Sequence, residues 1–275
     1  MNKLNISKPY HDDIFYPSSR DEIDRMIANI EVNINKIDVS GFLLPHAGYN
    51  YILPLLVEAF SMVESSFNNI IIVGSTHKEI LDKDAPYNLF TPSYDGMETP
   101  YGPILYNTDI INSFAKEGMK RDSYFEEEPE FELLYPLIKK YFPTTRVVPI
   151  CCSIKNSKQS KDLATILNKI YSLDDNTLII VTSNMNSLKK ANIAYKDAIN
   201  FLQTMDRGDY LLKPESQKLV TACGSGILDA LKKSKILKDK KWKLITFERD
   251  GVISSKIDIA NSKSKIVYHG LGILK

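Results

Sequence analysis

The chain has few cysteines and almost no excess of basic over acidic residues. Its 275 residues include only three cysteines, and two of them, Cys151 and Cys152, are adjacent. Three cysteines cannot form the disulfide framework of a secreted protein, so we expect reduced thiols and a cytoplasmic location. Lys and Arg number 35 against 34 Asp and Glu. This balance gives no electrostatic reason to expect nucleic acid or an anionic membrane as a partner.

Long apolar runs and glycine-rich motifs are also missing. No apolar run approaches the roughly 18 residues of a membrane-spanning helix. The start, MNKLNISKPYHDD, is polar, so we expect no signal peptide. The 12 glycines are dispersed, and neither Gly-x-Gly-x-x-Gly nor a Walker A pattern occurs, so no nucleotide cofactor is expected. The absence of Gly-x-Ser-x-Gly argues against an α/β-hydrolase.

Short apolar runs alternate with helical patterns along the whole chain. Strands are expected at 42–45, 69–73, 146–152, 177–181, 242–248 and 265–269, with 42–44, 69–73 and 177–181 central. Helices are expected from a capping box at 19–22, around 54–63, 131–141, 163–170, 190–205 and 215–222, and after Gly226. The segment 81–106, rich in Pro, Tyr and Gly, is expected to be a long ordered excursion. This alternation predicts one α/β domain over residues 1–275, a three-layer α/β sandwich with a mixed, mostly buried central sheet.

Two of the four histidines directly follow predicted strands. His46 lies in GFLLPHAGYNY and His77 in NIIIVGSTHKE. Ligands of open α/β sheets bind at the carboxyl ends of strands, and imidazole is the commonest protein metal ligand. Cys223, in TACGSG, lies at another transition that resembles a strand-to-helix turn. Two imidazoles and a thiolate that converge from three segments would form a small metal or redox centre.

Each of these residues also has a purely structural interpretation. His46 could hydrogen-bond the backbone of a tight turn, and His77 could be a surface loop residue. Cys223 could be a small buried packing residue, since free cysteine is among the most buried residue types. For Cys151 and Cys152, which alternate faces of a strand, we expect a packing role.

Several motifs together resemble one known family. PHAGY, GSTH, ETPYGPI, EPEFELLYPLI, VVPI, TSNMNS and TACG occur in the order found in the Memo-like family, the protein B of the bacterial AmmeMemoRadiSam gene set. FYPSSRDEI and SKIVYHGLGIL extend this resemblance over nearly the whole chain. The resemblance implies the fold of LigB-type (class III) extradiol dioxygenases, an α/β sandwich. It also implies that His46, His77 and Cys223 line one pocket as metal ligands. Tyr49 follows His46 closely in the sequence, so we expect it on the wall of this pocket.

The outer positions of the family pattern are changed. The family's Glu-His-Ser-Leu-Glu is EPEFE at 128–132, so Pro129 replaces a histidine. The family's Ser-Ser-Asp-x-Ser-His is TSNMNS at 182–187, so Asn184 and Ser187, both expected to line the pocket, replace an aspartate and a histidine. A serine hydroxyl does not titrate near neutrality. Extradiol cleavage needs Fe(II) and a base, so efficient dioxygenase activity is not expected.

The three glutamates of EPEFE precede a predicted helix, where carboxylates are favoured by the helix dipole. We therefore interpret them at this stage as helix-start residues.

Two functions of different class remain open. In the first, the protein is a metal-binding, redox-active enzyme, at most a metal-dependent oxidoreductase, that uses His46, His77 and Cys223. A thiolate in place of a carboxylate ligand favours Cu or Zn, with Fe(II) still compatible. In the second, it is a non-catalytic scaffold that binds a peptide, a small molecule or a partner protein. Retention of the three inner ligands favours the first function, and loss of the outer groups favours the second.

Overall fold

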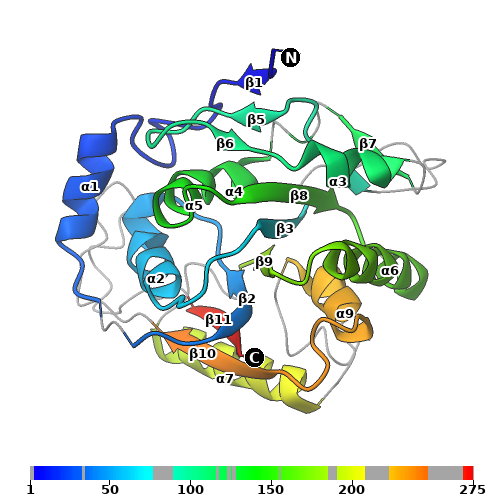
Figure 1. Cartoon of the computed structure of the whole chain (residues 1–275). Helices are drawn as coiled ribbons and strands as arrows, with labels where there is room; N and C mark the ends of the chain where they lie inside the picture. The colour runs from blue at the N-terminus through cyan, green and yellow to red at the C-terminus, as the bar shows by residue number, and fades with distance from the viewer. Residues whose placement is uncertain are drawn as a thin grey trace.

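A large mixed sheet runs through the middle of the molecule (Figure 1). The computed structural model describes residues 3–32, 35–76, 89–115, 118–122, 125, 128–154, 156–184, 191–207, 223–246 and 269–274. Within these residues the strand order is β10-β11-β2-β9-β3-β8-β4-β7. The strands are β2 (Val39–Leu44), β3 (Asn69–Ser75), β4 (Leu89–Thr91), β7 (Met119–Arg121), β8 (Arg146–Cys152), β9 (Thr177–Thr182), β10 (Lys241–Thr246) and β11 (His269–Leu274).

The four strands β2, β9, β3 and β8 pair in parallel at the centre of the sheet. Their residues are almost all buried, because helices cover both faces, and this burial explains the continuous apolar runs such as NIIIV. The predicted central strands are therefore confirmed. Since parallel strands run the same way, their carboxyl ends lie together at one edge of the sheet.

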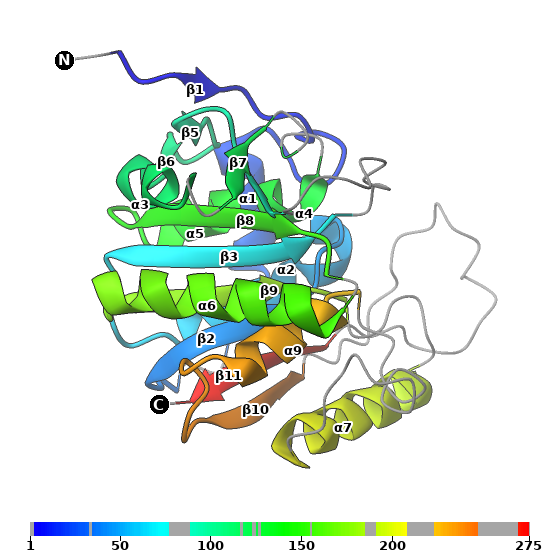
Figure 2. The same ribbon diagram turned by 90° about the vertical axis from the view of Figure 1, so that its right-hand side faces the viewer.

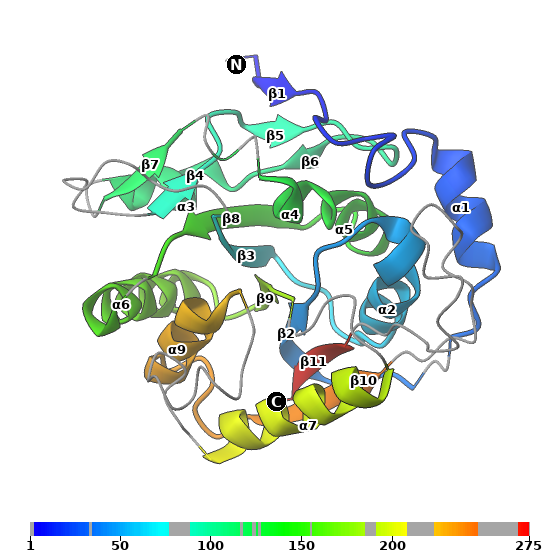
Figure 3. The same cartoon turned by 180° about the vertical axis from the view of Figure 1, so that it is seen from behind.

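Helices cover both faces of the sheet (Figures 1 and 3). On one face lie α2 (Tyr49–Ser61) and α5 (Tyr135–Tyr141), with α1 (Arg20–Ala28) packed outside α2. On the other lie α6 (Ser157–Leu173) and α9 (Ser225–Lys233), which stand in front of the strands in Figure 2. α7 (Ala191–Arg207) packs against β10 and β11. The predicted three-layer α/β sandwich is confirmed.

Smaller elements complete the end of the sheet near β8 (Figure 2). They are β1 (Ile6–Ser7), β5 (Gly96–Met97), β6 (Ile104–Leu105), α3 (Thr108–Ser113) and α4 (Pro129–Glu132). β1, β5 and β6 form a separate sheet, and β4 pairs with β8. The described part of the predicted excursion 81–106 is thus built into two sheets. Among the described residues, no helix combines the length and apolar character needed to cross a bilayer.

Proline explains two wrong helix boundaries. The helix expected from Pro54 begins at Tyr49 and keeps Pro54 in its interior. Burial of Ile52, Leu53 and Leu56 outweighs the one backbone hydrogen bond that proline cannot make. The helix expected over 131–141 is divided into α4 and α5. Pro136 causes this break, because its ring clashes with the carbonyl four residues earlier and it has no N–H to donate.

Other predicted ends differ by less. Ser19 is the N-cap of α1, but its side chain makes no capping hydrogen bond, so the capping-box prediction holds for the boundary alone. α6 begins earlier than predicted, at an Asn156 cap that accepts from Gln159 N at 3.0 Å. The predicted helix 215–222 lies outside the described residues. So does the predicted strand 265–269 up to its last residue, His269, where β11 begins.

Candidate functional site

The carboxyl ends of β2, β9 and β3 bring distant residues together. His46 follows β2 by two residues, Asn184 follows β9 by two, and Cys223 lies just before α9. Ser75, the last residue of β3, donates from Oγ to the Cys223 carbonyl at 3.2 Å. Ser183 connects the same regions, since its Oγ accepts from Gly224 N at 2.8 Å. These contacts place the cysteine loop at the ends of the central strands.

Two of the three predicted metal ligands face each other. His46 Nε2 lies 3.7 Å from Cys223 Sγ. The same sulfur accepts from the Asn184 backbone N–H at 3.4 Å and lies 3.4 Å from Ser183 Oγ. Cys223 is exposed, whereas the His46 side chain is only 8% exposed. The interpretation of Cys223 as a buried packing residue is therefore wrong.

The opposite side of the His46 ring is held by polar groups. Its Nδ1 lies 2.9 Å from Thr182 Oγ1 and 3.6 Å from Glu130 Oε2. Asn184 fixes the backbone of His46 from both sides: its Oδ1 accepts from His46 N at 3.0 Å, and its Nδ2 donates to His46 O at 3.1 Å. The Asn184 amide thus serves to shape the turn that carries the histidine.

The three glutamates at α4 are buried, which sequence reasoning missed. Glu128, Glu130 and Glu132 are 3%, 0% and 2% exposed. Glu128 accepts from Thr76 Oγ1 at 2.6 Å. Glu132 accepts from His11 N at 2.8 Å and approaches the same residue's Nδ1 at 2.9 Å. A helix dipole acts on exposed carboxylates as well, so it does not explain this burial. The available signal was a run of glutamates inside an apolar segment.

Cys151 and Cys152 in β8 are buried, as expected for packing residues. Burial raises the pKa of both thiols, and the nearby Glu130 carboxylate adds to the shift. Cys152 Sγ donates to the Gly74 carbonyl at 3.4 Å. Neither thiol is set up to react at neutral pH.

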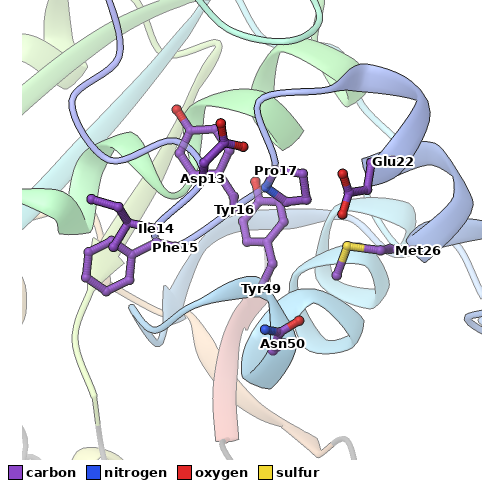
Figure 4. A pocket seen from close by; sticks show the side chains of 9 residues that line it. All are labelled: Asp13, Ile14, Phe15, Tyr16, Pro17, Glu22, Met26, Tyr49 and Asn50. Carbon is purple, nitrogen blue, oxygen red and sulfur yellow. The ribbon is translucent and has the colours of Figure 1, made fainter. Parts of the chain in front are cut away.

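Tyr49, which was expected on the pocket wall near His46, lines a hollow that His46 and Cys223 do not line. Its ring is buried, its Oη donates to Leu133 O at 3.0 Å, and it lies beside the ring of Tyr16. Together these rings line a hollow of about 210 Å³ (Figure 4). The other lining residues are Asp13, Ile14, Phe15, Pro17, Glu22, Met26 and Asn50. None of His46, Asn184 or Cys223 lines this hollow.

Two predicted site residues, His77 and Ser187, lie outside the described residues. Among the residues that the structure does describe, no three or more His, Cys, Asp or Glu side chains are grouped so that they could hold a metal ion. The arrangement around His46 and Cys223 therefore brings together one imidazole nitrogen and one sulfur. The third predicted donor, His77, follows β3 closely in sequence, after Ser75 and Thr76.

Comparison with known proteins gives a consistent family. A family model described as Memo-like protein matches residues 8–267. A MEMO1 family protein of Thermoplasma volcanium is 24% identical over 272 residues, covering 95% of this chain and 98% of its own length. MEMO1 family proteins of Nitrosopumilus maritimus and Thermotoga petrophila are 23% and 25% identical, covering 96% and 95% of this chain and 98% and 99% of their own lengths. The chain therefore belongs to the Memo-like protein family.

Proposed function

We propose that the edge of the sheet beside His46 binds a single soft transition-metal ion, with His46 Nε2, Cys223 Sγ and the imidazole of His77 as donors. The 3.7 Å between Nε2 and Sγ carries the proposal. With metal–nitrogen bonds of about 2.0–2.1 Å and a metal–sulfur bond of about 2.3 Å, a tetrahedral angle at the ion separates the two donors by about 3.6 Å. The donors thus already have the spacing of two ligands of one ion.

The chemistry of the donors favours Cu or Zn, with Fe(II) compatible. A copper or iron ion held there would supply one-electron redox chemistry. The protein would contribute access and orientation. Cys223 is exposed, whereas the Nδ1 side of the His46 ring lies against Thr182 and Glu130. The Asn184 backbone N–H donates to the sulfur and favours a negative charge there.

The alternative function is a scaffold that binds a peptide, a small molecule or a partner protein without turnover. The two hydrogen bonds that occupy the Asn184 side chain favour this scaffold function. Its side-chain amide is used on both sides by the His46 backbone, and an amide cannot transfer protons as the aspartate of the family pattern can. Pro129 likewise offers no titratable group. For the same reason, efficient ring cleavage is not part of the proposal.

Metal analysis of protein purified without a metal-affinity column tests the proposal. We expect close to one bound ion per chain, and protection of the Cys223 thiol by added Zn(II) or Cu(I). Cys223→Ser and His46→Ala should each lose the ion while keeping the fold. His11→Gln is the matched control, because His11 contacts Glu132 instead of the cysteine. Failure of wild-type protein to retain or bind any of these ions, with no protection of the thiol, would leave the scaffold function.

A further inference from the structure

The Glu130 carboxylate lies beside Nδ1 of His46, the ring nitrogen on the side away from Cys223. The side chain is fully buried at the start of α4, and its Oε2 lies 3.6 Å from His46 Nδ1. This glutamate occupies the serine position of the family's Glu-His-Ser-Leu-Glu pattern.

The sheet is shaped to admit this carboxylate. A Cβ atom on Gly74 would lie 1.9 Å from Glu130 Oε1 and 2.7 Å from its Cδ, far inside van der Waals contact. Gly74 is in β3, where residues 70–73 carry large apolar side chains. Glycine at this position in a buried strand is explained by the close approach of the acid and of the neighbouring Phe131, whose Cζ would lie 2.8 Å from the same Cβ. Gly74 and Glu130 therefore form a matched pair from distant segments.

The Thr182 hydroxyl alone does not decide which ring nitrogen of His46 carries the proton, whereas the Glu130 carboxylate favours one of them. Thr182 Oγ1, 2.9 Å from Nδ1, can donate to a nitrogen lone pair or accept from an N–H. When ionised, as at the alkaline pH of the test below, the Glu130 carboxylate only accepts, and at 3.6 Å its charge repels a lone pair on Nδ1 and attracts an N–H there. The neutral ring then keeps its proton on Nδ1. Its lone pair is on Nε2, which faces Cys223 Sγ.

We propose that Glu130 is a positioning residue that holds the proton of His46 on Nδ1 and so directs the Nε2 lone pair toward Cys223. Carboxylates that fix a ligating imidazole in this way raise its basicity as a ligand. The effect on metal binding rests on the proposed function. The choice of tautomer does not, because it is a property of the metal-free protein.

The test reads the tautomer directly. Protein labelled with ¹⁵N at histidine is stripped of metal, and its long-range ¹H–¹⁵N correlations are recorded at alkaline pH, with His46 assigned from His46→Gln. We expect wild-type His46 to carry its proton on Nδ1. In Glu130→Gln, of nearly the same size, the amide NH₂ can donate to Nδ1, so the proton should move substantially to Nε2. Glu130→Asp keeps an acid and should restore the Nδ1–H form in part.

Two further variants separate positioning from general disturbance. Glu132→Gln removes another buried acid of α4, one that contacts His11, so it should change the His11 signals and leave His46 unchanged. Gly74→Ala keeps the acid but displaces it, and where it folds it should shift His46 as Glu130→Gln does. In a separate Zn(II) titration, Glu130→Gln should weaken binding by about 10–100-fold.

The outcomes distinguish this inference from the metal site. A wild-type His46 with its proton on Nε2, or a tautomer that is the same in wild type and Glu130→Gln, would overturn the role of Glu130. If the tautomer shifts as expected but wild type binds no Zn(II), Cu(I) or Fe(II), the positioning role stands and the metal site is wrong. If metal binds tightly in both proteins and the tautomer is unchanged, the metal site stands without Glu130.

Discussion

Replacing Lys233 by methionine should destabilise the protein strongly, because it leaves a buried carboxylate without its cation. Asp229 in α9 is 1% exposed at its side chain, and its Oδ2 accepts from Lys233 Nζ and from Ser160 Oγ, the latter at 2.7 Å. Lys233 also donates to Ser157 Oγ at 3.0 Å, so the cluster joins α9 to α6. α9 begins two residues after Cys223, and the cluster therefore anchors the helix that follows the cysteine loop.

The magnitude follows from the burial of the pair. Removing one partner of a buried ion pair costs about 3–5 kcal/mol, because the remaining charge is left in a poorly solvated site. At about 2–4 °C per kcal/mol, Lys233→Met should lower the melting temperature by roughly 6–20 °C. The double variant Asp229→Leu/Lys233→Met removes both charges and adds apolar volume, so its stability should lie close to that of wild type.

Urea unfolding followed by far-UV circular dichroism measures these free energies, with the fluorescence of Trp242 in β10 as a second probe. The control is Arg20→Met. Arg20 and Asp24 form a pair of the same i,i+4 spacing, but their side chains are 65% and 36% exposed. Exposed pairs contribute about 0–1 kcal/mol, so this control should change stability little. A loss below about 1 kcal/mol for Lys233→Met would refute the argument that this cation compensates a buried charge.

Three further predictions concern thiols, the amino-terminal segment and acid. Cys223 should be the one thiol of three that reacts rapidly with a chromogenic disulfide reagent, since burial raises the pKa of the two cysteines in β8; a second fast thiol would contradict this. Glu132→Ala should lower the free energy of unfolding by at least about 2 kcal/mol and speed amide exchange over residues 10–16, because this carboxylate accepts hydrogen bonds from backbone and hydroxyl groups there. Unchanged exchange would exclude this anchoring role. Hydrogen bonding, first of all from Lys140, lowers the pKa of Asp24 in the folded protein. This carboxylate therefore stabilises the fold at pH values above its unfolded pKa, and the stabilisation is lost as pH falls through its lower pKa in the folded state. Asp24→Asn should thus be less stable than wild type at neutral pH in urea unfolding, and the difference should shrink as pH falls below the ordinary aspartate pKa of about 3.9; a difference that stays the same would count against the mechanism.

The central strands were predictable because parallel strands are buried on both faces. β8 has the predicted bounds, and β3 and β9 extend the predicted runs by one or two residues. Their spatial order, β2-β9-β3-β8, does not follow the chain order, and nothing in a single sequence fixes it. The placement of His46 at a carboxyl end follows from its strand alone. Its approach to Cys223 depends on a contact between two residues that lie 177 positions apart in the sequence.

The environment of Glu130 could not be predicted from local pattern. A glutamate in the first turn of a helix usually has a sufficient explanation in the helix dipole. Its burial here depends on the missing side chain of Gly74, in a strand far away in the sequence, and on a histidine after another strand. Such three-way arrangements become visible only when the strands are placed beside one another.

The position of β11 has a consequence for synthesis on the ribosome. β11 lies between β10 and β2, and β10 has no other partner within the described sheet. A nascent chain that has emerged as far as residue 246 can assemble the parallel strands in the order β2-β9-β3-β8, yet the other edge of β2 has no strand partner and neither has β10. An uncovered apolar edge is a template for pairing with other chains. The interval before residues 269–274 emerge is therefore when this protein most needs a chaperone.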